Sequence, residues 1–85
     1  MGKLIIESHL AACVNVWPIE SIYFWENKLI EDNEAVLLIK TNESKIAEIE
    51  ELILKNHFYA TPFIGSIDVR RFNHEYKEWM STVIR

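Results

Sequence analysis

The spacing of hydrophobic positions predicts two strands in the first half of the chain. Residues 12–25 favour a strand, because β-branched and aromatic side chains occupy many of the positions. Pro18 lies within this run and has no N–H, so we expect a bulge, a sheet edge or a bend there. Residues 35–40 are continuously apolar before the terminal lysine, which predicts a strand buried on both faces. Residues 26–28 read as a turn, so the two strands should form a hairpin.

Helical spacing follows the second strand. Residues 41–43 predict a helix start, and isoleucines at helical spacing continue to about Asn56 with acids on the opposite side. Residues 63–69 read as a third strand, and Asn73 is placed to cap a final helix. We interpret residues 3–11 as the tail of a first helix. The order helix, strand, strand, helix, strand, helix is most of a split β-α-β unit, so we predict an α+β, ferredoxin-like fold.

Composition narrows the class of protein. At 85 residues the chain is one domain, residues 1–85, and such a small core commonly needs subunit association. The single cysteine rules out an internal disulfide, and with no secretory signal or membrane-spanning run we expect a cytoplasmic protein without a membrane partner. A net charge of −4 argues against nucleic acid as a partner.

Three aromatic residues stand side by side just before the predicted turn. Tyr23 and Trp25 should point to one face of the strand and Phe24 to the other. One small layer of helices cannot cover all three rings. We therefore expect the distal hairpin to pack on a neighbouring subunit.

Four segments of the chain form a recognisable set of motifs. These are "LAACVN" at 10–15, "SIYFWENKL" at 21–29, "LLIKT" at 37–41 and a His-x-Tyr-x-x-Pro segment at 57–62. Together they resemble the CutA family, the divalent-cation tolerance proteins. The resemblance covers nearly the whole chain. It implies a ferredoxin-like homotrimer with a long hairpin, whose hairpin and last strand make inter-subunit sheets. It also implies a function in divalent-cation tolerance, with copper or another divalent metal bound in clefts between subunits.

The chain departs from the family pattern in two places. Family members begin with a strand and the first helical turns ahead of the "LAACVN" segment, whereas only residues 1–8 precede the similar stretch here, which starts at His9. We expect either that this strand is missing or that residues 3–6 rearrange to take its place. Ala60 and Phe63 stand where the family has glutamates of its cleft.

Two residues are candidate metal ligands. Cys13 is the softest donor present, and a thiolate with imidazole suits copper or zinc. The competing interpretation is a small buried side chain in an apolar strand. His57 matches the family's cleft motif, but it also follows the predicted end of a helix, where a cation is favourable near the last carbonyls. The histidines share no metal-ligand spacing, so a site would have to assemble in space.

Other residues are candidates for a ligand cleft or for the trimer interface. Tyr59 matches the cleft motif, Lys40 offers a charge to an anion or is a solvated strand tip, and Glu26 adds an acid at the hairpin tip. Tyr23, Phe24 and Trp25 are the candidates for the trimer interface.

The sequence leaves two alternatives to a metal-tolerance protein. One is a trimeric signalling or scaffold module that binds a small ligand. The other is a small acylphosphatase-like enzyme, which needs an anion-cradling loop with an arginine after the first strand. The chain shows neither that loop nor a nucleophile–base pair, so we do not expect an enzyme.

Overall fold

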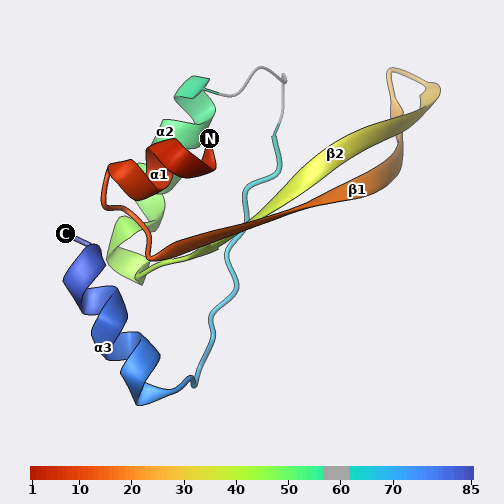
Figure 1. Ribbon diagram of the computed structural model, residues 1–85. Coiled ribbons are helices and arrows are strands. Elements are labelled where there is room, and N and C mark those ends of the chain that lie inside the picture. Colours follow the sequence, from red (N-terminus) through yellow and green to blue (C-terminus); the bar gives the residue numbers. More distant parts are fainter. Residues whose placement is uncertain (57–61) are drawn as a thin grey trace.

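A two-stranded hairpin and three helices make up the regular structure of the part that the computed structural model describes, residues 1–56 and 62–85 (Figure 1). The hairpin projects beyond the helices, and the molecule measures 47 × 25 × 18 Å. The elements are α1 (Gly2–Glu7), β1 (Cys13–Trp25), β2 (Lys28–Lys40), the 3-10 turn η1 (Glu43–Lys45), α2 (Ile46–Asn56) and α3 (His74–Val83).

The hairpin is a continuous antiparallel ladder. It runs from the pair Cys13 and Lys40 to the pair Trp25 and Lys28 without a break in register. Glu26 and the next residue, Asn27, both have positive φ, 51° and 64°, which is the backbone of a two-residue hairpin turn. The predicted turn is therefore confirmed. However, β2 starts at Lys28 rather than at residue 35, because pairing with β1 orders a polar stretch that hydropathy alone would not select.

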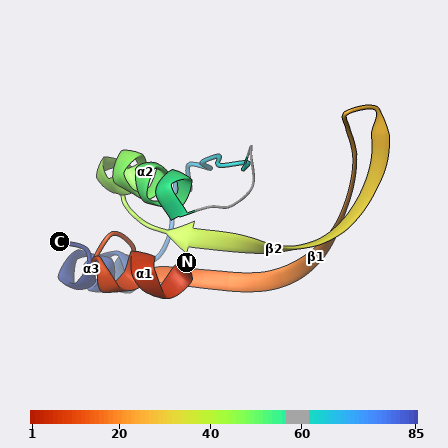
Figure 2. The same cartoon turned by 90° about the horizontal axis from the view of Figure 1, so that it is seen from above.

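Pro18 is accommodated inside the ladder, directly opposite Ala35. Of the bulge, sheet edge or bend expected there, the structure has the sheet edge without a bulge, since every residue on either side keeps its single partner. Because proline has no N–H to donate, its nitrogen must face away from β2, on the outer edge of β1. The hairpin as a whole curves along its length (Figure 2).

The register divides the hairpin into two faces. Directly opposed residues share a face, so Val14 and Ile39 lie on one side and Cys13 and Lys40 on the other. Val14 and Ile39 pack against the core of α1 and α2, and we call their side the α1 face. Lys40 lies over Tyr76 of α3, and we call that side the α3 face.

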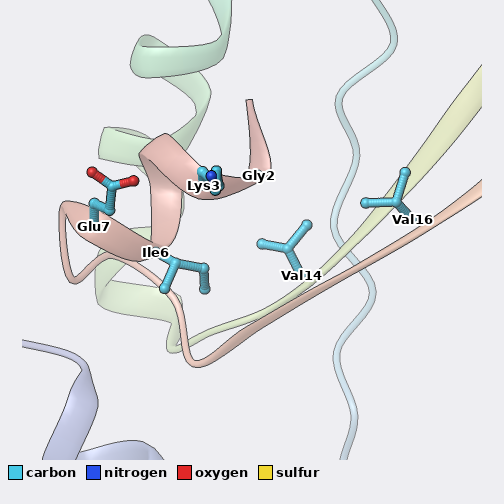
Figure 3. Close-up of a pocket in the computed structure, with 6 residues that line it drawn as sticks. All are labelled: Gly2, Lys3, Ile6, Glu7, Val14 and Val16. Atoms are coloured by element: carbon cyan, nitrogen blue, oxygen red, sulfur yellow. The ribbon is translucent and has the colours of Figure 1, made fainter.

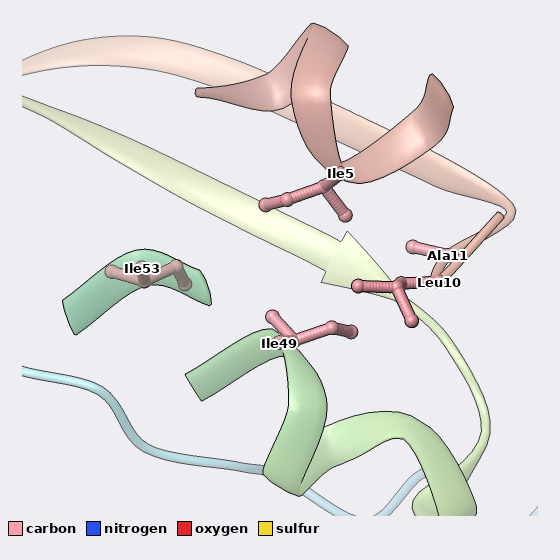
Figure 4. Close-up of a cluster of buried hydrophobic side chains, with 5 residues drawn as sticks. All are labelled: Ile5, Leu10, Ala11, Ile49 and Ile53. Carbon is pink, nitrogen blue, oxygen red and sulfur yellow. The ribbon is translucent and has the colours of Figure 1, made fainter. Parts of the chain in front are cut away.

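The larger core cluster forms where α1 and α2 meet the base of the hairpin (Figure 4). Ile5 is fully buried there, and the apolar stripe of α2 buries Ile49 and Ile53, as its helical spacing predicted. A smaller cluster joins Met80 of α3 to the start of β1. The burial predicted on both faces of residues 35–40 is wrong for this subunit, because the helices reach only the base of the hairpin and Leu38 stays 45% exposed.

The residues expected to cap the helices do not form the expected side-chain hydrogen bonds. Asn42 caps η1 without a side-chain hydrogen bond, and Thr41 donates instead to the carbonyl oxygen of Leu10. Asn73 is at the N-cap of α3, as expected, but its side chain forms no capping bond. The helix of residues 46–56 ends where the sequence placed its end.

The third strand expected at residues 63–69 is absent. Residues 62–73 have no regular secondary structure, and no backbone hydrogen bond joins residues 62–72 to other parts of the structure described above. A strand needs a partner for its N–H and C=O groups, and neither edge of the hairpin supplies one. The alternation of apolar and polar residues correctly predicted an extended backbone. Whether an extended backbone pairs as a strand depends on the tertiary structure.

The N-terminal residues are helical, as we interpreted them. Residues 3–6 lie within α1 and therefore do not replace a strand of the sheet. The helix is shorter than the predicted tail and ends at Glu7, after which His9 takes a positive φ of 57°. Among the described residues, no helix combines the length and hydrophobicity needed to cross a membrane.

Candidate functional site at the base of the hairpin

Three chemically active side chains meet at the base of the α3 face. Cys13 and Lys40 are directly opposed at the first pair of the hairpin, and α3 brings Tyr76 against both. The Nζ atom of Lys40 lies 5.6 Å from the centre of the Tyr76 ring, within the range of a cation–π contact. The hairpin register and the packing of Met80 therefore position this group.

Among these three side chains, Tyr76 has a clearly shifted pKa. Burial raises the pKa of its phenol, because the anion loses water, and the neighbouring Cys13 raises that pKa further through its charge and a hydrogen bond. The phenol therefore stays protonated, as a hydrogen-bond donor, over the neutral range. Sequence reasoning placed Tyr76 on the apolar face of a helix and gave no sign of this contact with Cys13.

The side chain of Cys13 is half-buried. It is therefore neither a fully buried core residue nor a fully exposed ligand. Its thiol approaches the Oδ1 atom of Asn15 at 3.7 Å. No group of three histidine, cysteine or acidic side chains suited to a metal ion occurs within residues 1–56 and 62–85. Within the described residues Cys13 is thus a thiol without a surrounding metal-ligand group, beside a lysine whose positive charge opposes a cation.

The other predicted site residues are not part of this group. Glu26 is exposed at the turn, at the opposite end of the ladder from Cys13. His57 and Tyr59 lie outside the described residues, so their predicted roles are untested. Of the predicted metal and cleft residues, Cys13 and Lys40 are the two that the described structure brings together.

A shallow groove runs between α1 and β1 on the opposite face (Figure 3). Its volume is about 450 Å³, and Val14 and Val16 point toward α1 across it. The remaining lining residues are Gly2, Lys3, Ile6 and Glu7. Gly2 favours the close approach, because a Cβ atom there would lie 3.2 Å from a side-chain carbon of Val14, closer than an ordinary van der Waals contact. The groove contains none of the predicted site residues.

The aromatic residues near the turn lie on the two faces that the alternation predicted. The pairs Tyr23–Ile30 and Trp25–Lys28 belong to the α3 face, and Phe24 belongs to the α1 face. Phe24 is 75% exposed and Trp25 is 49% exposed. The helices of the subunit leave both rings largely uncovered.

Comparison with known families decides the relationship. Residues 1–83 match the family described as CutA1 divalent ion tolerance protein. The chain belongs to this CutA1 family. The resemblance drawn from the sequence is thereby confirmed.

Relatives from distant organisms match nearly the whole chain. The divalent-cation tolerance protein CutA of Archaeoglobus fulgidus is 34% identical over 84 residues, which are 99% of this chain and 82% of that protein. The chloroplastic protein CutA 1 of Oryza sativa subsp. japonica is 42% identical over 82 residues, which are 95% of this chain but 46% of the rice protein. The name of the Archaeoglobus fulgidus protein describes tolerance to divalent cations.

Solved CutA structures share the fold. The Archaeoglobus fulgidus structure, named as a periplasmic divalent cation tolerance protein, superposes with a TM-score of 0.93 at 35% identity, covering 98% of this chain and 81% of the other. A PII-like CutA protein from Nostoc superposes with a TM-score of 0.91 at 28% identity, covering 99% and 83%. The subunit therefore has the α+β, ferredoxin-like fold that the order of elements predicted.

Proposed function

We propose that this CutA1 protein acts in divalent-cation tolerance as a cytoplasmic homotrimer that binds copper or a similar divalent metal between its subunits. The uncovered α3 face of the hairpin carries the proposal. Trp17, Tyr23 and Trp25 lie along this face and are 39–49% exposed. Several half-exposed aromatic side chains on one face are typical of a subunit interface.

A homotrimer also accounts for the small core. The two clusters bury eight hydrophobic residues in all, and both lie at the base of the hairpin. Association of the projecting hairpins would bury the aromatic rings that the helices leave in water. Tyr23, Phe24 and Trp25 remain the residues we assign to this interface.

The metal site we propose combines Cys13 with donors from a second subunit. A thiolate is a good ligand for copper, but the described part of one subunit provides no complete ligand set. Assembly between subunits supplies the missing ligands, and His57 is our candidate for one of them. Tyr76 lies beside Cys13, and the thiol would lose its proton when the metal binds.

Calorimetry combined with light scattering tests the proposal. We expect the intact protein to have the mass of a trimer and to bind copper(II), and we expect Cys13→Ser to remain trimeric while losing most of the binding. Asn15→Ser is the matched control, because it changes the neighbour of the thiol and keeps the thiol itself. A monomeric mass would overturn the assembly, and copper binding unchanged in Cys13→Ser would overturn the ligand assignment.

A second function is favoured by Lys40. Its charge lies at the base of the hairpin beside Tyr76, an arrangement suited to an anionic small ligand, and one solved neighbour is named PII-like. A trimeric module that binds a small ligand would retain that binding after all metal is chelated. Titration with nucleotides in the presence of a chelator, on the intact protein and Lys40→Met, separates this function from metal binding.

A further inference from the structure

His9 occupies the left-handed backbone position that ends α1. Its N–H donates to the carbonyl oxygen of Ile6, and the N–H of Leu10 donates to that of Ile5. This pair of bonds is the Schellman ending of a helix, and Leu10 and Ile5 also share the larger core cluster. The residue with positive φ in this motif is usually glycine, because a Cβ atom strains the backbone there. A histidine with φ of 57° therefore indicates that its side chain makes a compensating interaction.

The side chain and the carbonyl group of His9 both bond to the end of α3. The Nδ1 atom lies 3.2 Å from the carbonyl oxygen of Val83, so this nitrogen carries the hydrogen and donates it. The carbonyl oxygen of His9 accepts a hydrogen bond from the N–H of Arg85 at 3.1 Å. Figure 1 shows this end of α3 beside the loop that follows α1. A glycine could form the second bond but not the first, so the histidine adds a side-chain link between the loop and α3.

The same loop is bonded to the strand end that carries Lys40. The N–H of Ala12 donates to the carbonyl oxygen of Lys40 at 2.9 Å. On the other side, α3 presents Tyr76 to the ammonium group of Lys40, and Tyr76 and Val83 both pack against the smaller core cluster. These two residues share one face of a short helix, so a displacement of α3 at Val83 also moves Tyr76. The loop therefore fixes both sides of the contact between Lys40 and Tyr76.

We propose that His9 is a positioning residue of the candidate site, which holds the end of α3 on the loop so that Tyr76 stays against Lys40 and Cys13. The backbone alone favours glycine at residue 9, so the benefit of histidine lies in where it places α3. The inference rests on the proposed function, because the site that it positions is the proposed copper site at Cys13. An ammonium group held at the Tyr76 ring does not approach a metal on the thiol, and a fixed thiol loses less freedom when a metal binds.

The reaction of Cys13 with a thiol reagent tests the position of α3 without any metal. Cys13 is the single cysteine of the chain, so the aromatic disulfide dithiobis-nitrobenzoate reports on this site alone. We expect His9→Gly to raise the rate of this reaction about three- to tenfold, because α3 moves away from the thiol more often. Glycine is preferred at this positive φ, so the variant should still fold. His9→Asn keeps a donor at the place of Nδ1 and tolerates the same backbone, so its rate should return to that of the intact protein.

Two controls separate positioning from a general loss of stability. Thr41→Val removes the hydrogen bond to Leu10 in the same loop but leaves the bonds to α3, so it should destabilise the fold without raising the thiol rate in native buffer. In a Tyr76→Leu background, His9→Gly should raise the rate less than about twofold, because the side chain that it positions is gone. Equal rates in His9→Gly and the intact protein would overturn the proposal. A full rise in the Tyr76→Leu background would overturn it too, since His9 would then act independently of Tyr76.

Calorimetry with copper(II) on the same variants measures the consequence for binding. We expect His9→Gly to weaken copper binding about three- to tenfold and His9→Asn to restore it. Asparagine lacks the imidazole that suits copper, so this recovery would also exclude His9 as a ligand. If the intact protein binds no copper, the proposed function fails, while the thiol rates still decide the role of His9. If copper binds but the thiol rates of His9→Gly and the intact protein are equal, the positioning role fails and the proposed function stands.

Discussion

Thr41 donates its hydroxyl hydrogen to the carbonyl oxygen of Leu10, with 2.6 Å between the two oxygens. The bond joins the end of β2 to the loop between α1 and β1, and Leu10 is itself buried. Removing the hydroxyl leaves a shielded carbonyl without its partner. We expect Thr41→Val to lower the free energy of unfolding by about 1–2 kcal/mol in urea titrations. Thr41→Ser keeps the hydroxyl donor and should lower the free energy of unfolding much less. An equal decrease in both variants would show that the effect comes from packing and not from the hydrogen bond.

Ile5 anchors the larger core cluster and has no exposed surface. Replacing it with alanine opens a cavity between α1 and α2. We expect Ile5→Ala to lower the free energy of unfolding by about 2–4 kcal/mol at a fixed protein concentration. The control is Leu54→Ala on the exposed side of α2, which should change this free energy by less than about 0.5 kcal/mol. Similar losses in both variants would contradict the position of the core.

The raised pKa of Tyr76 predicts a loss of stability in alkaline solution. Well below pH 10 the phenol is protonated in both the folded and the unfolded chain, and it adds no pH dependence. As the pH rises through 10, the unfolded chain loses this proton first and binds fewer protons than the folded one, so the free energy of unfolding falls.

Urea titrations at several pH values check the role of Tyr76. We expect Tyr76→Phe to reduce the alkaline decline relative to the intact protein. Cys13→Ser should reduce it partly, because Cys13 contributes to the shift. An unchanged decline in Tyr76→Phe would assign the pH dependence to other groups.

A substitution of Trp25 tests the aromatic interface of the proposed homotrimer. A carboxylate in place of this half-exposed ring would have to be desolvated on assembly. We expect Trp25→Glu to weaken the trimer at least about tenfold in dissociation constant, measured by sedimentation equilibrium. Leu54→Glu places the same charge on an exposed apolar position of α2, away from the hairpin, and should leave the mass unchanged. If Trp25→Glu still formed a stable trimer, the turn region would not be part of the interface.

The candidate site could be predicted only in part from the sequence. Cys13 and Lys40 stood out by residue type, but their direct opposition depends on a register that the apolar run alone does not fix. Tyr76 was assigned to the core because its spacing is that of an apolar helix face. Its contact with Cys13 joins residues far apart in the chain, and nothing in the local sequence encodes it.

Local chemistry determined the helices and the hairpin turn. Apolar spacing placed Ile49 and Ile53 on the buried side of α2, and residues 26–28 gave the turn, because these preferences act within a few neighbouring residues. Tertiary structure decided whether an extended segment became a strand. Residues 28–34 pair despite their charges, whereas residues 62–72 remain unpaired despite their alternation. A strand is completed by hydrogen bonds to a neighbour, and the availability of that neighbour is a property of the whole fold.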